Sequence, residues 1–134
     1  MKTKMMIVSM LMAIFIAVTS FTFLQQPKPW PVPEKNSKMA NPVKSDDASL
    51  KEGKAIWSKD CSSCHGKSGK GDGTKAAGLK TPPGDFTSAA VHAETDGDLF
   101  YKISEGRGDM PTFKKKIPDA DEIWSVVNYM RTFK

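Results

Sequence analysis

A single hexapeptide, CSSCHG at residues 61–66, contains both cysteines of this 134-residue chain and one of its two histidines. Cys61, Cys64 and His65 therefore lie next to one another in the chain, and no other cysteine is present to pair with them. Four kinds of chemistry use such a cluster: a structural disulfide, a dithiol redox pair, a zinc site and the covalent attachment of haem. The remaining residues discriminate among these four.

The N-terminus predicts export. Lys2 and Lys4 precede an uncharged, largely apolar run from Met5 to Leu24, and basic residues followed by an apolar run are typical of an export signal. Residues 1–24 are either a cleaved signal peptide or an uncleaved membrane anchor, because the run just reaches the length of a membrane span, about 20 residues. In both cases we expect the rest of the chain outside the cytoplasm.

The net charge of +5 comes from the N-terminal part of the chain. Residues 1–45 contain six lysines and one glutamate, whereas residues 46–134 contain fourteen basic and fourteen acidic side chains. Binding of nucleic acid requires basic charge gathered on the folded domain, so we expect no nucleic-acid partner. The one local basic run in the domain is Lys114–Lys116.

Residues 25–45 are rich in proline, with four prolines between Pro27 and Pro33. This composition favours extended, polyproline-like conformations, so we expect a semi-rigid tether. An equal alternative is that Trp30 and Val32 lie on the surface of the domain. At this chain length one folded domain is expected, and we place it at residues 46–134.

Helical patterns dominate the domain, and we find no convincing strand. Leu50, Gly53 and Trp57 recur at helical spacing and share one face, and Asp47 is the expected N-cap of that helix. Helices are predicted over residues 47–60, 96–105 and 118–133, and a glycine-rich loop over 66–84. Three short helices with long loops make a small hydrophobic core, and a domain of this size usually needs a disulfide, a metal or another aid.

Three of the four chemistries fit the cysteine cluster poorly. A disulfide between Cys61 and Cys64 would close a very short loop and stabilise little. A thioredoxin-like dithiol follows a strand in a βαβ unit, and no such pattern is present. A structural zinc ion needs four ligands, and Cys61, Cys64, His65 and His92 make four, but the adjacent pair Cys64 and His65 is awkward for one ion.

Covalent haem attachment fits all the surroundings of the cluster. In C-x-x-C-H the two thiols bond to the two vinyl groups of haem, and the adjacent imidazole reaches the iron. Haem would also supply the large apolar body that the core lacks, and export agrees because c-type haem is attached outside the bacterial cytoplasm. We therefore expect one haem c, attached through Cys61 and Cys64, with His65 as one axial ligand.

Residues 46–134 resemble a small class I cytochrome c of bacterial respiratory chains. The resemblance rests on Gly53 and Trp57 and on the segments CSSCHG, KTPPGDF, GRGDMPTF and WSVVNYMRTF. It implies an all-α cytochrome c fold, in which three main helices and long loops surround one covalently bound haem. It also implies that the first and last helices cross where Gly53 meets an aromatic residue, either Trp124 or Tyr129.

The second axial ligand separates an electron carrier from a haem enzyme, because a permanent ligand keeps small molecules off the iron. Met110 lies in a glycine-flanked loop and is followed by Pro111, and the resemblance implies that Met110 is this ligand. His92 reads as a surface histidine, Met39 lies in the tether, and Met130 falls on the apolar face of the last helix.

A carbonyl that accepts the other imidazole N–H of His65 would orient the ring and strengthen its donation to iron. The resemblance implies that Pro82 provides this carbonyl. The residues alone fit Pro83 equally well, because the two prolines are adjacent.

We predict an electron-transfer protein that is not an enzyme and has no small-molecule substrate. By resemblance it passes single electrons between a quinol-oxidising complex and a terminal oxidase or reductase, at the periplasmic face of the bacterial inner membrane, which it contacts through its N-terminal segment. One alternative is a haem enzyme or gas sensor with an open or displaceable sixth ligand, and another is a subunit of a larger respiratory complex. Lys114–Lys116 form either a docking site for an acidic redox partner or a solvated loop.

Overall fold

The computed structural model describes residues 29–134. The apolar run from Met5 to Leu24 lies outside these residues, and so does the prediction of a signal peptide or membrane anchor. Within the described part of the chain, no helix is long and apolar enough to cross a membrane.

The first long helical run carries the cysteine cluster and extends beyond its predicted end. Helix α3 (Asp47–Ile56) continues into the π-helix η2 (Trp57–Cys61) and then into α4 (Ser62–His65). The helix was expected to end near residue 60, but the backbone N–H of Ser62 bonds to the Trp57 carbonyl, which carries the helix through Cys61. A π-turn holds one residue more than an α-turn, so it rotates the following side chains about the helix axis.

The start of α3 is capped one residue earlier than expected. The side chain of Asp46, not Asp47, accepts the backbone N–H of Ser49, and the Ser49 hydroxyl accepts the backbone N–H of Asp46 in return. This reciprocal pair is a capping box, and it leaves Asp47 as the first helical residue, where its negative charge favours the helix N-terminus.

Two further helices complete the framework. Helix α6 (Asp96–Glu105) matches the predicted bounds, and Thr95 caps its N-terminus. Helix α7 (Ala120–Met130) is shorter at its C-terminus than predicted, although Phe133 beyond its end is still buried. Three short segments were not predicted: α2 (Glu34–Ser37), the 3₁₀ turn η3 (Ala76–Gly78) and α5 (Ala89–His92).

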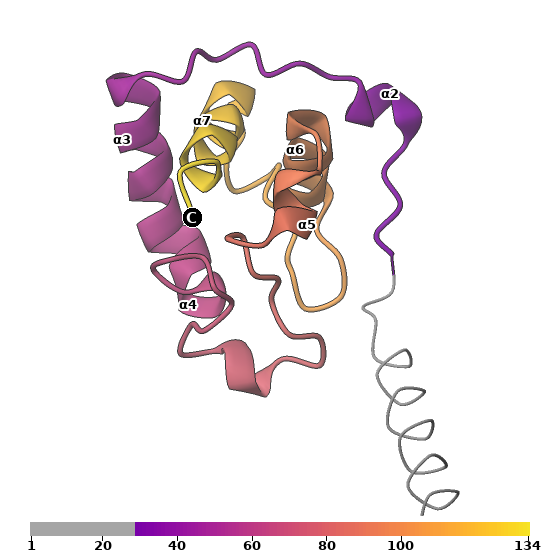
Figure 1. Cartoon of the computed structure of the whole chain (residues 1–134), viewed down its shortest axis with the longest axis vertical. Coiled ribbons are helices and arrows are strands. Elements are labelled where there is room, and N and C mark those ends of the chain that lie inside the picture. The colour runs from indigo at the N-terminus through magenta and orange to yellow at the C-terminus, as the bar shows by residue number, and fades with distance from the viewer. Residues whose placement is uncertain (1–28) are drawn as a thin grey trace, which may run out of the picture. The chain divides into compact units, whose positions relative to one another are not determined.

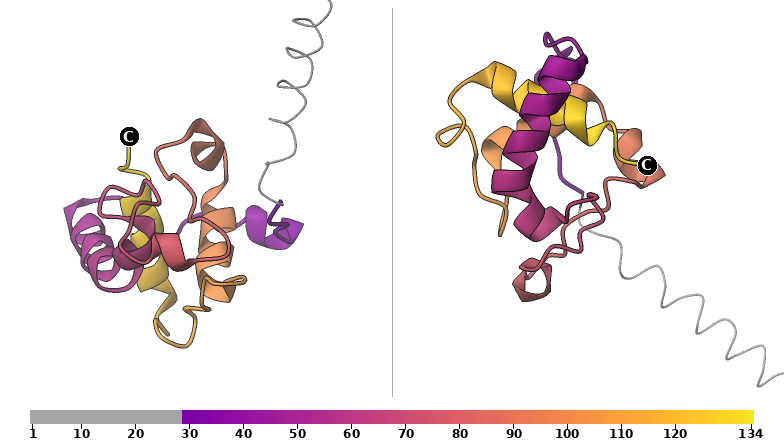
Figure 2. Two further views of the ribbon diagram at one scale, coloured as in Figure 1. Left: turned by 90° about the horizontal axis from the view of Figure 1, so that it is seen from below. Right: turned by 90° about the vertical axis from the view of Figure 1, so that its left-hand side faces the viewer.

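Helices α3 and α7 cross at Gly53, and Figure 2 shows the two ribbons passing over each other in its right-hand view. A Cβ atom at Gly53 would lie 2.0 Å from the Ser125 carbonyl oxygen and 2.9 Å from the Tyr129 Cβ. Of the two aromatic candidates, Tyr129 therefore meets this glycine. Trp124 instead stacks on Phe100 of α6, with ring centroids 4.1 Å apart.

The helices enclose one apolar core, and the described residues contain no strand beyond an isolated bridge between Arg107 and Met110. This confirms the all-α fold class. Trp57 and Val127 are among the most buried side chains, at 2% and 0% exposed. The core consists of Trp57, Leu99, Ile103, Phe113, Ile117, Ile123, Trp124, Val126, Val127, Met130 and Phe133.

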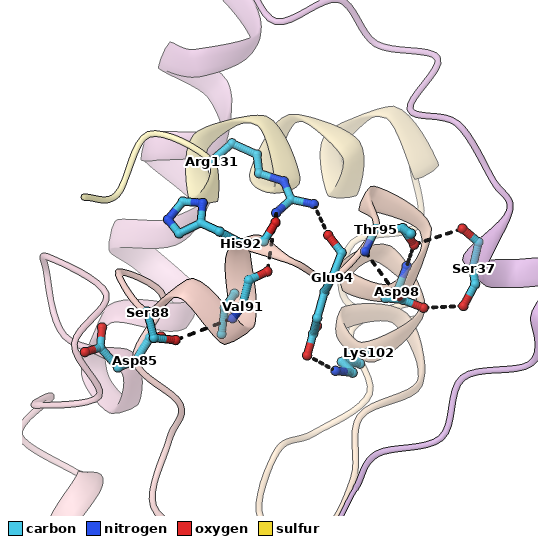
Figure 3. A network of polar contacts seen from close by, with 10 residues as sticks. All are labelled: Ser37, Asp85, Ser88, Val91, His92, Glu94, Thr95, Asp98, Lys102 and Arg131. Atoms are coloured by element: carbon cyan, nitrogen blue, oxygen red, sulfur yellow. Dashed lines mark hydrogen bonds and ion pairs between the residues drawn. The ribbon is translucent and has the colours of Figure 1, made fainter.

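The proline-rich segment joins the folded body earlier than the predicted boundary at Asp46. Residues from Val32 onward belong to the same compact unit as the helices, and Figure 1 shows this segment passing over α6 and α7 before it enters α3. Helix α2 packs against α6, and the Ser37 hydroxyl donates to the Asp98 carboxylate while the Ser37 carbonyl accepts from Thr95 (Figure 3). We call residues 32–45 the strap.

Asn41 fastens the strap to α7. Its side-chain amide donates to the Asn128 oxygen at 2.9 Å and to the Trp124 carbonyl at 3.3 Å, while its oxygen accepts the N–H of Val43. Asn128 is buried and in turn donates to the carbonyl of Val43 and the hydroxyl of Ser49. The strap thus satisfies a buried polar side chain of the core.

We expect Asn41→Ala to lower the free energy of unfolding by about 1–3 kcal/mol, because it leaves the buried Asn128 side chain without one of its partners. Urea unfolding followed by circular dichroism measures this. Lys44→Ala is the matched control, because Lys44 lies in the same strap with an exposed side chain. Equal midpoints for the two variants would show that the Asn41 contacts add nothing to stability.

Candidate haem-binding site

The two cysteines occupy the last residue of η2 and the third residue of α4, about one helical turn apart. Both are free thiols and half-buried, so no disulfide joins them. Burial raises the pKa of the Cys61 thiol to about 12, and the neighbouring Asp60 carboxylate pushes this pKa in the same direction. Two free thiols one helical turn apart match the pattern that attaches haem.

His65 ends α4, with its ring in an aromatic environment. The ring centroid lies 5.8 Å from that of Trp57 and 5.0 Å from that of Phe86. Burial lowers the pKa of His65, which favours the neutral imidazole that a metal requires. The ring atom Nδ1 is buried and has no hydrogen-bond partner among the described residues.

Trp57 packs beside the histidine ring and stabilises the turn that follows it, a role that sequence reasoning did not assign. Its indole N–H donates to the Gly66 carbonyl at 3.0 Å, directly after His65. Gly66 has φ +80°, a conformation that favours glycine. The chain therefore turns sharply away from the helix at Gly66, while the indole holds the turn in place.

The loop after His65 folds back over the cluster. The N–H of Gly71 bonds to the His65 carbonyl at 2.9 Å, and the N–H of Gly73 bonds to the Cys64 carbonyl at 3.2 Å. Gly71 also has a positive φ, and a Cβ there would lie 2.5 Å from the Pro83 carbonyl oxygen. These glycines let the loop and the Pro83 backbone lie directly against the residues around His65.

Met110 is half-buried against the core, at the end of a tight turn. Arg107 and Met110 exchange two backbone hydrogen bonds, at 2.9 and 3.0 Å. Gly108 has φ +60° and Asp109 has a negative φ, which is the pattern of a type II′ turn. The two hydrogen bonds and the turn geometry thereby fix the backbone at Met110.

Asp109 joins this turn to the loop that contains Pro82. Its carboxylate oxygen Oδ2 accepts the N–H of Lys80 at 2.7 Å and the N–H of Thr81 at 3.4 Å. Sequence reasoning did not single out Asp109, because the two segments are far apart in the chain. Its position between a glycine and Met110 was the only available signal.

Pro82 lies between Thr81, which contacts the Met110 turn, and Pro83, which contacts the loop after His65. On one side, Thr81 bonds to Asp109, the neighbour of Met110. On the other side, Pro83 packs against Gly71, which bonds to His65. No hydrogen bond joins the Pro82 carbonyl to the His65 ring in the described structure, so this contact stays a prediction.

Comparison with known protein families identifies the family of this chain. Residues 48–130, more than half of the chain, match the model of a family described as "Cytochrome C oxidase, cbb3-type, subunit III". The chain belongs to this family. It is a small c-type cytochrome, and the family implies covalently bound haem c, electron transfer and redox protein partners. No curated protein matches the chain.

One solved structure supports the fold of this cytochrome. It is a chain of the Kuenenia stuttgartiensis reducing HAO-like protein complex Kustc0457/Kustc0458, with a TM-score of 0.61 and 23% sequence identity. The match covers 82% of the present chain and 53% of that chain. The cytochrome therefore spans about half the length of this structural neighbour, and at this identity the likeness concerns the fold alone.

The donor set of the cytochrome fits haem c. Two free thiols and a neutral imidazole are the groups that attach haem c and bind its iron, and a thioether is one of the groups that can take the second axial position. Elsewhere, His92 is exposed as predicted, with Nε2 3.1 Å from the Phe133 carbonyl oxygen, and Met130 is buried in the core as predicted. Among residues 29–134, no three His, Cys, Asp or Glu side chains are grouped to hold a metal ion.

His92 lies in a polar network that stabilises the chain end (Figure 3). Arg131 follows α7 and donates to the carbonyls of Val91, His92 and Glu94 and to the Asp96 carboxylate. One guanidinium thus joins the last helix to α5 and to the start of α6. These contacts give His92 a structural setting at the chain end.

We expect Asp109→Ala to release the contact between the Met110 turn and the Pro82 loop. Hydrogen exchange at the amides of Lys80 and Thr81 should become several-fold faster, because a lost hydrogen bond costs roughly 1 kcal/mol. Asp109→Asn keeps an acceptor oxygen and should exchange nearly as the wild type does. Unchanged protection in Asp109→Ala would show that other contacts hold this loop.

Proposed function

We propose that the chain is a single-haem electron carrier without enzymatic activity, working between respiratory complexes on the periplasmic face of the bacterial inner membrane. The observation that carries this proposal is the joining of the Met110 turn, through Asp109, to the loop that packs beside His65. Candidate ligands for both faces of one iron thereby come from two segments that the loop of residues 80–83 joins.

Each residue of the site has a distinct part in this proposal. Cys61 and Cys64 hold the cofactor by thioether bonds, and His65 and Met110 are the axial ligands. Pro82 accepts the N–H of the His65 ring, with Pro83 as the second choice. Haem c, when bound, supplies an iron that gains and loses one electron between its ferric and ferrous forms. Thioether sulfur favours the ferrous form and raises the reduction potential relative to two histidines.

The alternative is a haem enzyme or gas sensor, in which Met110 leaves the iron open or is easily displaced. We favour the carrier because the Met110 backbone is held by two hydrogen bonds within its turn and by the adjacent Asp109 contacts. A ligand on a fixed turn resists displacement by small molecules.

The decisive test is the optical spectrum of the purified holoprotein and of Met110→Ala. We expect the wild type to show a low-spin c-type spectrum with the weak far-red band of methionine sulfur on ferric iron. Met110→Ala should lose this band and bind carbon monoxide in the ferrous form, because the sixth position is then open.

Met39→Ala is the matched control, since Met39 is exposed in the strap, and it should keep the far-red band. A high-spin wild type that binds carbon monoxide would favour the enzyme or sensor. Absence of covalent haem, in cells able to mature c-type cytochromes, would reject the whole proposal.

The distribution of surface charge indicates where a redox partner docks. Lys114 pairs with Glu105 and Lys116 pairs with Asp60, so two lysines of the run 114–116 are neutralised. The loop beside the cysteine cluster, residues 66–85, contains four lysines and two aspartates and so has a net charge of +2, although the Lys70 charge acts on the Asp85 carboxylate. Its exposed lysines are Lys67, Lys70, Lys75 and Lys80. We place the docking of an acidic partner at this loop rather than at Lys114–Lys116.

We expect the rate of electron transfer from a quinol-oxidising complex to fall as ionic strength rises, because salt screens the attraction between the loop and an acidic partner. Replacement of the four loop lysines by glutamine should lower the rate at low salt and flatten this dependence. Lys114→Gln, which removes a lysine already paired with Glu105, is the control and should change little. A salt dependence that persists unchanged in the fourfold variant would exclude this surface.

A second arrangement is a stable subunit of a larger respiratory complex, as the description of the family suggests. In this arrangement the proline-rich tether before the folded unit would dock on the complex instead of leaving the domain free to move. Purification of the full chain from membranes in mild detergent separates the two. A constant set of copurified subunits would favour the complex, and isolation of the chain alone would favour a shuttle.

A further inference from the structure

Asp60 is a buried carboxylate that directly precedes Cys61. Its side chain is only 6% exposed, which is unusual for an acidic residue unless a partner compensates its charge. The partner is Lys116, whose Nζ lies 2.5 Å from the Asp60 Oδ1. This ion pair joins the end of the helix that carries the cysteines to the segment that follows the Met110 turn.

Lys116 is held in place by its own backbone. Its N–H and that of Ile117 both bond to the Phe113 carbonyl, at 2.9 and 2.7 Å. Phe113 and Ile117 are buried on either side of it, while the Lys116 side chain is 57% exposed and its ammonium lies 5.8 Å from the Phe113 ring centroid. The two charged groups therefore differ in solvent exposure, because Asp60 is shielded from water and Lys116 is not.

Both charges act electrostatically on the Cys61 thiol, a group to which members of this family attach haem. Although burial is the main reason for the raised pKa of Cys61, Asp60 raises this pKa further and Lys116 lowers it. A charge that acts on the Cys61 sulfur also acts on a cofactor bonded to that sulfur, because electrostatic energy falls only slowly with distance in a poorly solvated environment.

We propose that Asp60 and Lys116 form a compensated charge pair beside the haem attached at Cys61, in which Lys116 prevents the buried Asp60 carboxylate from lowering the reduction potential. Ferric haem accepts one electron from a donor to become ferrous and thereby loses one positive charge. The Asp60 carboxylate stabilises the ferric form, and the Lys116 ammonium offsets this effect. The proposal rests on the proposed function only in requiring haem at Cys61, and it holds whichever residue is the second axial ligand.

The test is the midpoint potential of holoprotein variants, measured by spectroelectrochemistry. Lys116→Gln should lower the potential, because Asp60 is left uncompensated, whereas Lys116→Arg keeps the charge and should keep the wild-type potential. Lys115→Gln removes an exposed lysine from the same run and should shift the potential less. The shift in Lys116→Gln should persist at high salt because Asp60 is buried, while any shift in Lys115→Gln should fade.

Asp60→Asn completes the cycle. It should raise the potential, and the double variant Asp60→Asn with Lys116→Gln should return toward the wild type. Where Asp60→Asn fails to take up haem, the Lys116 variants decide alone. Equal shifts in Lys116→Gln and Lys115→Gln at every salt concentration would overturn the inference and leave the pair a purely structural contact.

The failure of this inference is distinct from the failure of the proposed function. A wild-type protein without covalent haem, or without a reversible one-electron couple, would reject the electron carrier. A normal wild-type couple whose potential does not respond to Lys116→Gln would reject only the role of the charge pair.

Discussion

The close crossing of α3 and α7 at Gly53 is the contact on which the rest of this cytochrome depends. Any side chain at this position would overlap the backbone of Ser125, since a Cβ would lie 2.0 Å from its carbonyl oxygen. The Ser125 hydroxyl also donates to the Glu52 carboxylate at 2.7 Å, beside the crossing. Because the crossing fixes the direction of α3, it also fixes where Trp57, the cysteines and His65 lie.

A helical run carries Cys61, Cys64 and His65, and loops complete the site around them; backbone hydrogen bonds give these loops their shape. Glycines with positive φ allow the loop after His65 to lie against Pro83, and a type II′ turn fixes Met110. One carboxylate, that of Asp109, then joins the two loops. Such an arrangement combines a rigid helical frame with short loops that carry the functional groups, as is common in binding sites.

The strap is part of the folded unit, although its proline-rich composition predicts a tether. A proline-rich composition favours extended structure, but the residues from Val32 onward use that extension to cover α6 and α7 and to satisfy the buried Asn128. Composition describes the local conformation of such a segment. It does not tell whether polar side chains elsewhere in the fold need its hydrogen bonds.

The sequence by itself determined the all-α class, the bounds of α6, the buried Met130 and the attachment motif at Cys61, Cys64 and His65, because each depends on residue type and spacing within a short stretch. Only the tertiary structure decided that Tyr129 rather than Trp124 meets Gly53, that Asp109 reaches the loop at Thr81, and that Lys116 compensates a buried Asp60. These contacts join segments that are distant in the chain. Their partners are chosen by how the helices pack, and no local pattern encodes that choice.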